Sequence, residues 1–234
     1  MKVALALPIL TGMSWESFVT LRNMKGPIEE TLVTPMVPLS EARNCLATRF
    51  IRDTDCDAMM FAAGDMLYGA DALELLLDTM ARQPRAGVIV GIYHGKAYPY
   101  RPLIYEALGK PYFGYPKDGQ FRVHSSGLDC ALIRREVFER MQTQKGRYFR
   151  FTEKLSEDIA FAEALPEGIE MWADARVKCG HLAKVVVTEK WMQNARFAKD
   201  FLDLDTLPLW PVADERKLEQ KPRVQLVRDG GAGT

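Results

Sequence analysis

The chain has 234 residues, of which 47% are hydrophobic and 26% are charged. This composition is typical of a globular protein, and the length suits one large domain or one domain with an appendage. Lysine plus arginine and aspartate plus glutamate each total 31, so the formal net charge is zero, and the broad positive surface of a nucleic-acid-binding protein is not expected.

No apolar run approaches the roughly 18 residues of a transmembrane helix, and the apolar start at residues 1–8 is too short for a signal peptide. No membrane span is therefore expected. The four cysteines are widely spaced and contain no Cys-x-x-Cys pair, which argues against a zinc knuckle or a redox motif. They indicate free thiols in a reducing compartment, so we expect a cytoplasmic protein, in the host cytoplasm if the source is viral.

The first 92 residues alternate between strand and helix patterns. Strands are predicted at residues 3–7, 31–34, 57–63 and 87–92, and helices at 14–24, 40–52 and 70–83, with Ser14 and Ser40 as N-caps. This alternation is typical of a parallel sheet with crossover helices. Neither the glycine pattern of a dinucleotide-binding turn nor a P-loop occurs, which excludes those two phosphate-binding motifs.

The pattern changes after residue 92. Tyrosine, proline and glycine dominate residues 93–124, which favours short strands and hairpins, either packing among themselves or forming a cleft wall. A helix is predicted at 126–141, a basic loop at 142–150, a helix from Ser156, a strand at 169–172 and a helix at 190–201. From residue 204 onward we expect an extended arm and a mobile tail.

Three sites carry candidate chemistry. Asp65 follows an apolar strand and Gly64, where a carboxylate can hold a divalent metal or merely cap the next helix. Glu157 and Asp158 begin a helix, where acids complement the helix dipole but can also supply a general base. His181 follows Gly180 and is either a structural histidine or a metal ligand.

Several stretches match one family in order. They are the opening strand at 3–8, Ala42-Arg43-Asn44, residues 60–66, residues 126–135, Ser156-Glu157-Asp158 and Cys179-Gly180-His181. With them the chain resembles the GT-A-fold glycosyltransferases, especially small family-2-like enzymes of bacteria and phages, over about residues 1–185. The resemblance implies an α/β domain at 1–203 with a mostly parallel central sheet flanked by helices and a smaller antiparallel hairpin region, followed by the arm and tail at 204–234.

The resemblance also implies a nucleotide-sugar donor, a UDP-sugar first of all, bound with Mn²⁺ or Mg²⁺. Asp65 matches the second acid of the family's Asp-x-Asp motif, Ala63 stands where the first acid would be, and His181 matches a further metal ligand. Asp158 matches the usual general base, with Glu157 beside it. The candidate donor-binding residues are Pro8, Thr11, Arg43, Gly64, Asp65 and Gly127.

Two other functions stay open. One is a nucleotidylyltransferase on a related sheet, although the first loop lacks the glycines and basic residues expected of it. The other is a catalytically inactive GT-A domain that binds a sugar or a partner, which Ala63 favours. The acceptor is open among a DNA base, a polysaccharide and a protein, and the oligomeric state is not predicted.

Overall fold

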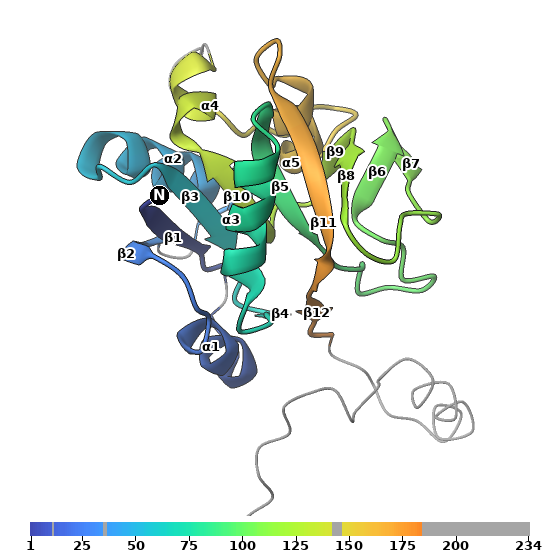
Figure 1. Cartoon of the computed structure of the whole chain (residues 1–234), viewed down its shortest axis with the longest axis horizontal. Coiled ribbons are helices and arrows are strands. Elements are labelled where there is room, and N and C mark those ends of the chain that lie inside the picture. Colours follow the sequence, from blue (N-terminus) through green and yellow to red (C-terminus); the bar gives the residue numbers. More distant parts are fainter. Residues whose placement is uncertain (11, 35–36, 142–146, 184–234) are drawn as a thin grey trace, which may run out of the picture. The chain divides into compact units, whose positions relative to one another are not determined.

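The structure is a computed structural model that describes residues 1–10, 12–34, 37–141 and 147–183 (Figure 1). Within these residues the largest sheet has seven strands in the order β2-β1-β3-β10-β5-β11-β8. Its strands are β1 (Val3–Pro8), β2 (Ile28–Thr34), β3 (Ala58–Ala62), β5 (Ala86–Ile92), β8 (Gln120–Val123), β10 (Cys130–Arg134) and β11 (Glu170–Lys178).

Five of the seven strands of this sheet run in the same direction. Strand β1 pairs in parallel with β2 and β3, and β11 pairs in parallel with β5. Strands β10 and β8 are antiparallel to their neighbours. The expected α/β fold with a mostly parallel central sheet is therefore confirmed.

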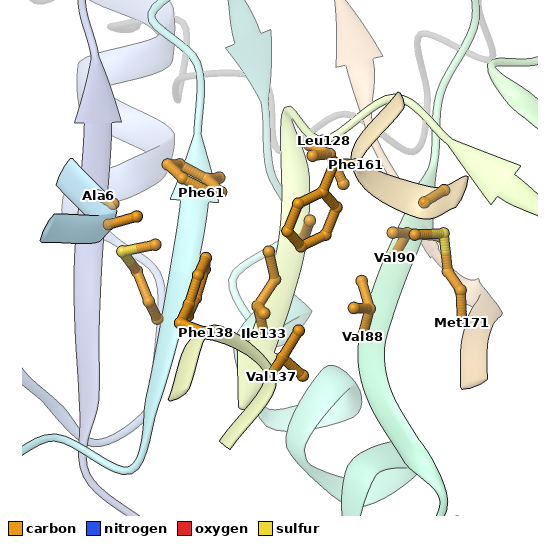
Figure 2. Close-up of a cluster of buried hydrophobic side chains, with 14 of the residues drawn as sticks. Ala6, Phe61, Val88, Val90, Leu128, Ile133, Val137, Phe138, Phe161 and Met171 are labelled. Carbon is orange, nitrogen blue, oxygen red and sulfur yellow. The ribbon is translucent and has the colours of Figure 1, made fainter. Parts of the chain in front are cut away.

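Helices cover both faces of the sheet. They are α1 (Trp15–Arg22), α2 (Leu39–Asp53), α3 (Ala72–Arg82), α4 (Arg135–Arg140) and α5 (Glu157–Glu163). Because successive strand residues point to opposite faces, Met59 and Phe61 of β3 join the core with α2, α4 and α5, whereas Met60 joins the core with α1 and α3. Figure 2 shows the first core, where Phe138 of α4 and Phe161 of α5 lie over the strands.

The predicted helix at 126–141 was wrong over most of its length. Residues 130–134 form β10, an inserted strand between β3 and β5, and a helix begins only at Arg135. The run Cys130-Ala131-Leu132-Ile133 is apolar on both sides because both sheet faces are covered, and such a run has no period that separates a buried strand from a buried helix.

Two smaller corrections concern element ends. Helix α2 begins at Leu39 behind Pro38, and Ser40 lies inside it rather than at its N-cap. Strand β11 continues to Lys178, well beyond the predicted end at residue 172, because it pairs with β5 on one side and β8 on the other.

Short antiparallel strands follow β5, as expected for residues 93–124. They are β6 (Ile104–Ala107) and β7 (Lys110–Pro111), and with β9 (Ser125–Ser126) they form a three-stranded sheet in the order β7-β6-β9. This is the predicted smaller hairpin region.

A two-stranded ribbon lies beyond the carboxyl ends of two central strands. Strand β4 (Met66–Leu67) follows β3, and β12 (Gly180–His181) follows β11. The two pair antiparallel, with His181 opposite Met66, and Figure 1 shows them together at one edge of the sheet. This ribbon joins segments more than 100 residues apart. It lies at the carboxyl edge of the sheet, where open α/β sheets bind their ligands.

The predicted helix at 190–201, the domain boundary at 203 and the tail at 204–234 lie outside the described residues. Among the helices that the structure does describe, none is long and apolar enough to cross a membrane.

Candidate active site

Asp65 and His181 face each other at the ribbon. The backbone N–H of Leu182 donates to the carbonyl oxygen of Asp65 at 2.8 Å, next to the paired residues Met66 and His181. As a result His181 Nε2 lies 3.9 Å from Asp65 Oδ1, with the Asp65 side chain 46% exposed and the His181 side chain 13% exposed. The pair is therefore open to a ligand on the Asp65 side.

The imidazole of His181 is held from behind. Its Nδ1 lies 2.8 Å from the carbonyl oxygen of His94, and the ring packs edge-to-face against Tyr93 with centroids 5.6 Å apart. Because a carbonyl oxygen can only accept, Nδ1 carries a proton, and in the neutral ring Nε2 keeps its lone pair. This is the arrangement that orients a metal-binding histidine.

The pair fits a divalent cation that a ligand completes. Neighbouring ligands of an octahedral ion with bonds of about 2.1 Å lie about 3.0 Å apart, so the two side chains, at 3.9 Å, would have to move together by about 1 Å to share one ion. The described residues contain no cluster of three or more acidic, cysteine or histidine side chains that could hold a metal without such help. Mg²⁺ often binds in this way, through one or two carboxylates and substrate phosphates.

A second carboxylate group surrounds Arg43, a residue of α2. The Arg43 guanidinium donates to Asp129 Oδ1 at 2.8 Å and to Glu157 Oε1, and its side chain is 2% exposed. Burial alone would lower the pKa of Arg43, but Asp129, Glu157 and Asp158 together raise it above its ordinary value. Burial raises the pKa of Glu157 in spite of the opposing charge of Arg43.

Tyr93 connects the two groups. Its hydroxyl lies 3.3 Å from Asp129 Oδ2 and accepts from the Asp129 backbone N–H at 3.1 Å, while its ring touches His181. Burial raises the pKa of Tyr93 well above its ordinary range, so the phenol stays protonated and can donate to Asp129. Contacting side chains thus run from His181 through Tyr93 and Asp129 to Arg43.

Gly127 leaves room for this connection. A Cβ at Gly127 would lie 2.1 Å from the Tyr93 hydroxyl and 3.6 Å from Asp158 Oδ2. The close approach at Gly127 is therefore made by a side chain of the protein itself, and the same position brings Asp158 near the connected groups.

Asp158 is the partly exposed acid of the Glu157–Asp158 pair. Its Oδ1 accepts from the Ser156 hydroxyl and, at 2.8 Å, from the backbone N–H of Ile159, which leaves Oδ2 for other partners. Glu157 is buried and points to Arg43. The two neighbouring acids of α5 therefore lie in different environments.

Two of the remaining predicted donor residues, Pro8 and Gly64, lie at or just after the ends of β1 and β3. Pro8 is the buried last residue of β1, and Thr11 lies outside the described residues. Gly64 accepts from the Ser14 backbone N–H at 2.8 Å, and a Cβ there would lie 2.8 Å from the Gly12 carbonyl oxygen. Gly64 thus allows the loop after β1 to pack against the end of β3.

Sequence reasoning missed three residues of this region: Tyr93, Lys96 and Asp129. Asp129 lies within the matched stretch 126–135, which could have drawn attention to it. Tyr93 is one of many tyrosines in its segment, and Lys96, whose ammonium contacts Asp65 Oδ2, lies in a loop without periodicity. Only tertiary contacts distinguish these two residues from their neighbours.

A cavity of about 600 Å³ lies elsewhere, bordered by α5, β8 and the start of β11. His124 and Glu163, which form an ion pair at 2.7 Å if the imidazole is protonated, are on its wall. Neither the Asp65–His181 pair nor the residues around Arg43 line it, so its size does not bear on the site at the carboxyl edge.

No known protein-family model matches the chain, and no curated protein matches it by sequence. Solved structures match the chain in fold. A crystal structure of A197 from STIV has a TM-score of 0.59 at 17% identity and covers 79% of this chain and 87% of its own. A crystal structure of GalNAc-T7 with UDP, GalNAc and Mn²⁺ has a TM-score of 0.56 at 8% identity. It covers 79% of this chain, which spans only 44% of the GalNAc-T7 chain. At such identities the likeness concerns the fold, and this chain has a GT-A-like fold.

Proposed function

We propose that this protein is a divalent-metal-dependent glycosyltransferase that moves a sugar from a nucleoside-diphosphate donor, first of all a UDP-sugar, to an acceptor hydroxyl. The observation that carries the proposal is the Asp65–His181 pair, 3.9 Å apart at the carboxyl edge of a GT-A-like sheet. GalNAc-T7, which has a similar fold, was crystallised with UDP, GalNAc and Mn²⁺, and this supports the donor and metal classes.

In the proposed reaction, Asp65 and His181 would hold Mn²⁺ or Mg²⁺. Such an ion stabilises the negative charge that develops on the departing diphosphate. Tyr93 and the His94 carbonyl keep the His181 ring in place, so that its lone pair stays directed toward Asp65. The proposed donor site is at the ends of β1 and β3, beside Pro8 and Gly64, and Thr11 stays a predicted donor contact.

Asp158 is the proposed general base. In an inverting transfer the acceptor oxygen forms a bond to the anomeric carbon and gives its proton to Asp158 Oδ2, while the bond to the diphosphate breaks and its electron pair leaves with the diphosphate. The Ser156 hydroxyl and the Ile159 N–H hold Oδ1 and thereby orient the carboxylate.

Arg43 and Glu157 are proposed as positioning residues for that base. Both are buried and bonded to each other, and the Arg43 Nε, which has no partner among the described residues, is itself buried. Their ion pair joins α2 to the start of α5, which fixes the position of the next residue, Asp158.

Thermal shifts with nucleoside diphosphates, each with and without Mn²⁺, test the donor class. A ligand at 100 times its Kd stabilises the folded state by about 2.7 kcal/mol, so UDP should raise the melting temperature in the presence of Mn²⁺. Asp65→Ala and His181→Ala should each remove the Mn²⁺-dependent shift. If no nucleoside diphosphate shifts the wild-type protein, the proposal is wrong.

Transfer itself is tested with Asp158→Asn. The variant should keep the shift with UDP and Mn²⁺ and lose roughly 10²- to 10⁴-fold in transfer, measured as UDP release from a UDP-sugar panel with candidate acceptors. Full transfer by Asp158→Asn would remove the base assignment. Ser156→Ala, which changes only the support of the carboxylate, should have a smaller effect.

An inactive GT-A domain is the second candidate, favoured by Ala63 in the place of the first motif acid. Such a domain binds a sugar or a partner and has no turnover. Asp65→Ala separates the two functions, because an enzyme loses turnover whereas a module that binds a partner at another surface keeps that binding.

A further inference from the structure

Lys96 occupies the side of Asp65 that His181 does not. Its ammonium contacts Asp65 Oδ2, whereas His181 Nε2 faces Oδ1, so the carboxylate lies between a lysine and a histidine. The Lys96 and Asp65 side chains are 40% and 46% exposed. A contact between two such exposed groups is easily exchanged for other partners.

The segment that carries Lys96 also contacts His181, the other candidate metal ligand. It leaves β5 at Tyr93 and returns at Leu103, closed by the Leu103 N–H to the Tyr93 carbonyl and the Gly95 N–H to the Arg101 carbonyl, both at 2.9 Å. His94, two residues before Lys96, accepts from His181 Nδ1. The same hairpin therefore orients His181 through the His94 carbonyl and places the Lys96 ammonium against Asp65.

The Lys96 ammonium changes the charge that a divalent cation meets at Asp65. Ala63 stands in the place of one motif carboxylate, so among the described residues Asp65 is the one acid that pairs with His181, and Lys96 already neutralises it. A divalent cation brought to Asp65 would lie within a few ångströms of a like charge, which repels it. A diphosphate reverses this balance because its negative charges accept both cations.

We propose that Lys96 is a diphosphate-binding residue that rests on Asp65 and competes there with the divalent cation. When donor and metal bind together, the metal takes Asp65 and the Lys96 ammonium moves to the diphosphate. Metal binding then depends on the diphosphate, and the site stays metal-poor without donor. This inference rests on the proposed function, since it assigns a role within the same donor site.

The test measures Mn²⁺ binding through the electron paramagnetic resonance signal of free Mn²⁺ and UDP binding by calorimetry. Four full-length proteins are compared: wild type, Lys96→Met, Lys96→Arg and Asp65→Asn. With Mn²⁺ alone, Lys96→Met should bind about tenfold tighter than wild type because a nearby positive charge is removed. Lys96→Arg keeps the charge and should resemble wild type, and Asp65→Asn should bind weakest.

UDP affinity, measured with saturating Mn²⁺, should change in the opposite direction. Lys96→Met should bind UDP about tenfold more weakly than wild type because one phosphate contact is lost. Unchanged or weaker Mn²⁺ affinity of Lys96→Met in the absence of UDP would overturn the proposed competition. Unchanged UDP affinity would overturn the transfer of Lys96 to the diphosphate.

The same data separate this inference from the proposed function. If wild type binds no UDP under any condition, the transferase proposal fails, whereas the comparison of Mn²⁺ binding between wild type and Lys96→Met still decides whether Lys96 competes for Asp65. Melting temperatures of all four proteins show whether each is folded, which their exposed substitution sites favour.

Discussion

Arg43 is a charged residue enclosed by the protein, and its partners decide whether it stabilises the fold. Its guanidinium bonds to Asp129 and Glu157, while its Nε has no partner among the described residues. Removing one partner of a buried ion pair leaves the other charge without compensation, which costs more than the pair contributes.

We therefore expect Arg43→Met to lower the free energy of unfolding by about 3–5 kcal/mol, measured by urea denaturation. The matched control is Arg52→Met, which removes an exposed arginine paired with Asp53 and should leave the free energy of unfolding almost unchanged. Adding Glu157→Gln to Arg43→Met should restore part of the loss. Equal effects of the two arginine substitutions would contradict the role assigned to the buried pair.

The Tyr93 hydroxyl occupies the space that a side chain at Gly127 would need. A Cβ at Gly127 would lie 2.1 Å from the Tyr93 hydroxyl and 3.0 Å from Cζ. Gly127→Ala should cost about 1–3 kcal/mol through overpacking, and the cost should be smaller in a Tyr93→Phe background, where the hydroxyl is absent. A double-mutant cycle by urea denaturation measures this coupling, and identical costs in both backgrounds would show that the hydroxyl is not the obstacle.

At the scale of elements, the start of α1 shapes the loop that reaches Gly64. Ser14 is the N-cap: its side chain accepts from the Ser17 N–H at 3.0 Å, and its own N–H donates to the Gly64 carbonyl. One residue thus ends the loop after β1, begins the helix and contacts the end of β3.

Ser14→Ala should lower the free energy of unfolding by about 1 kcal/mol, because a helix N–H loses its partner, whereas Ser14→Asp should retain most of the stability. Denaturation curves of both variants measure the difference. Ser40, which lies within α2 rather than at its N-cap, provides the contrast for the same substitution. Loss of equal size with Asp at position 14 would contradict the capping role.

Strand β10 is the element on which the sequence prediction failed, and its place in the sheet explains why. It inserts antiparallel between β3 and β5, so residues 130–134 are enclosed by two strands and by helices on both faces. Local sequence carries no sign of such an insertion, because the partners of β10 are about 40 and 70 residues away in the chain.

At the scale of the whole molecule, the exposed Asp53 and Asp55 and the buried Glu157 make the stability depend on pH in opposite directions. The hydrogen bond from Arg52 lowers the pKa of Asp53, and the hydrogen bond from Lys2 lowers that of Asp55. Such groups favour the folded state at higher pH, and their contribution is lost as the pH falls through the lowered pKa. Glu157 differs, because burial raises its pKa above 4.5.

A carboxyl group with a raised pKa in the folded state contributes stability below its unfolded pKa, and this contribution is lost as the pH rises through the folded pKa. Relative to Glu157→Gln, the wild-type protein should therefore lose stability as the pH rises above 4.5. Urea denaturation of both proteins from about pH 4 to 7 gives the difference curve, in which the other carboxylates cancel. Parallel curves would show that Glu157 has the same pKa in both states.

The sequence by itself determined the β–α alternation of the first 92 residues, the buried character of β3 and the residues at its end. These follow from local rules: apolar runs, caps and turn residues act over a few positions. Asp65, His181 and Asp158 could be singled out in the same way, from their places at element ends together with the family resemblance.

Only the tertiary structure decided which residues meet. The ribbon of β4 and β12 brings Asp65 to His181, and the hairpin after β5 brings Lys96 to Asp65. The ion pair with Arg43 gives Glu157 a different environment from that of its neighbour Asp158. Each of these contacts joins positions 31 to 116 residues apart. Their environments depend on burial and on nearby charges, and both exist only once the sheet has assembled.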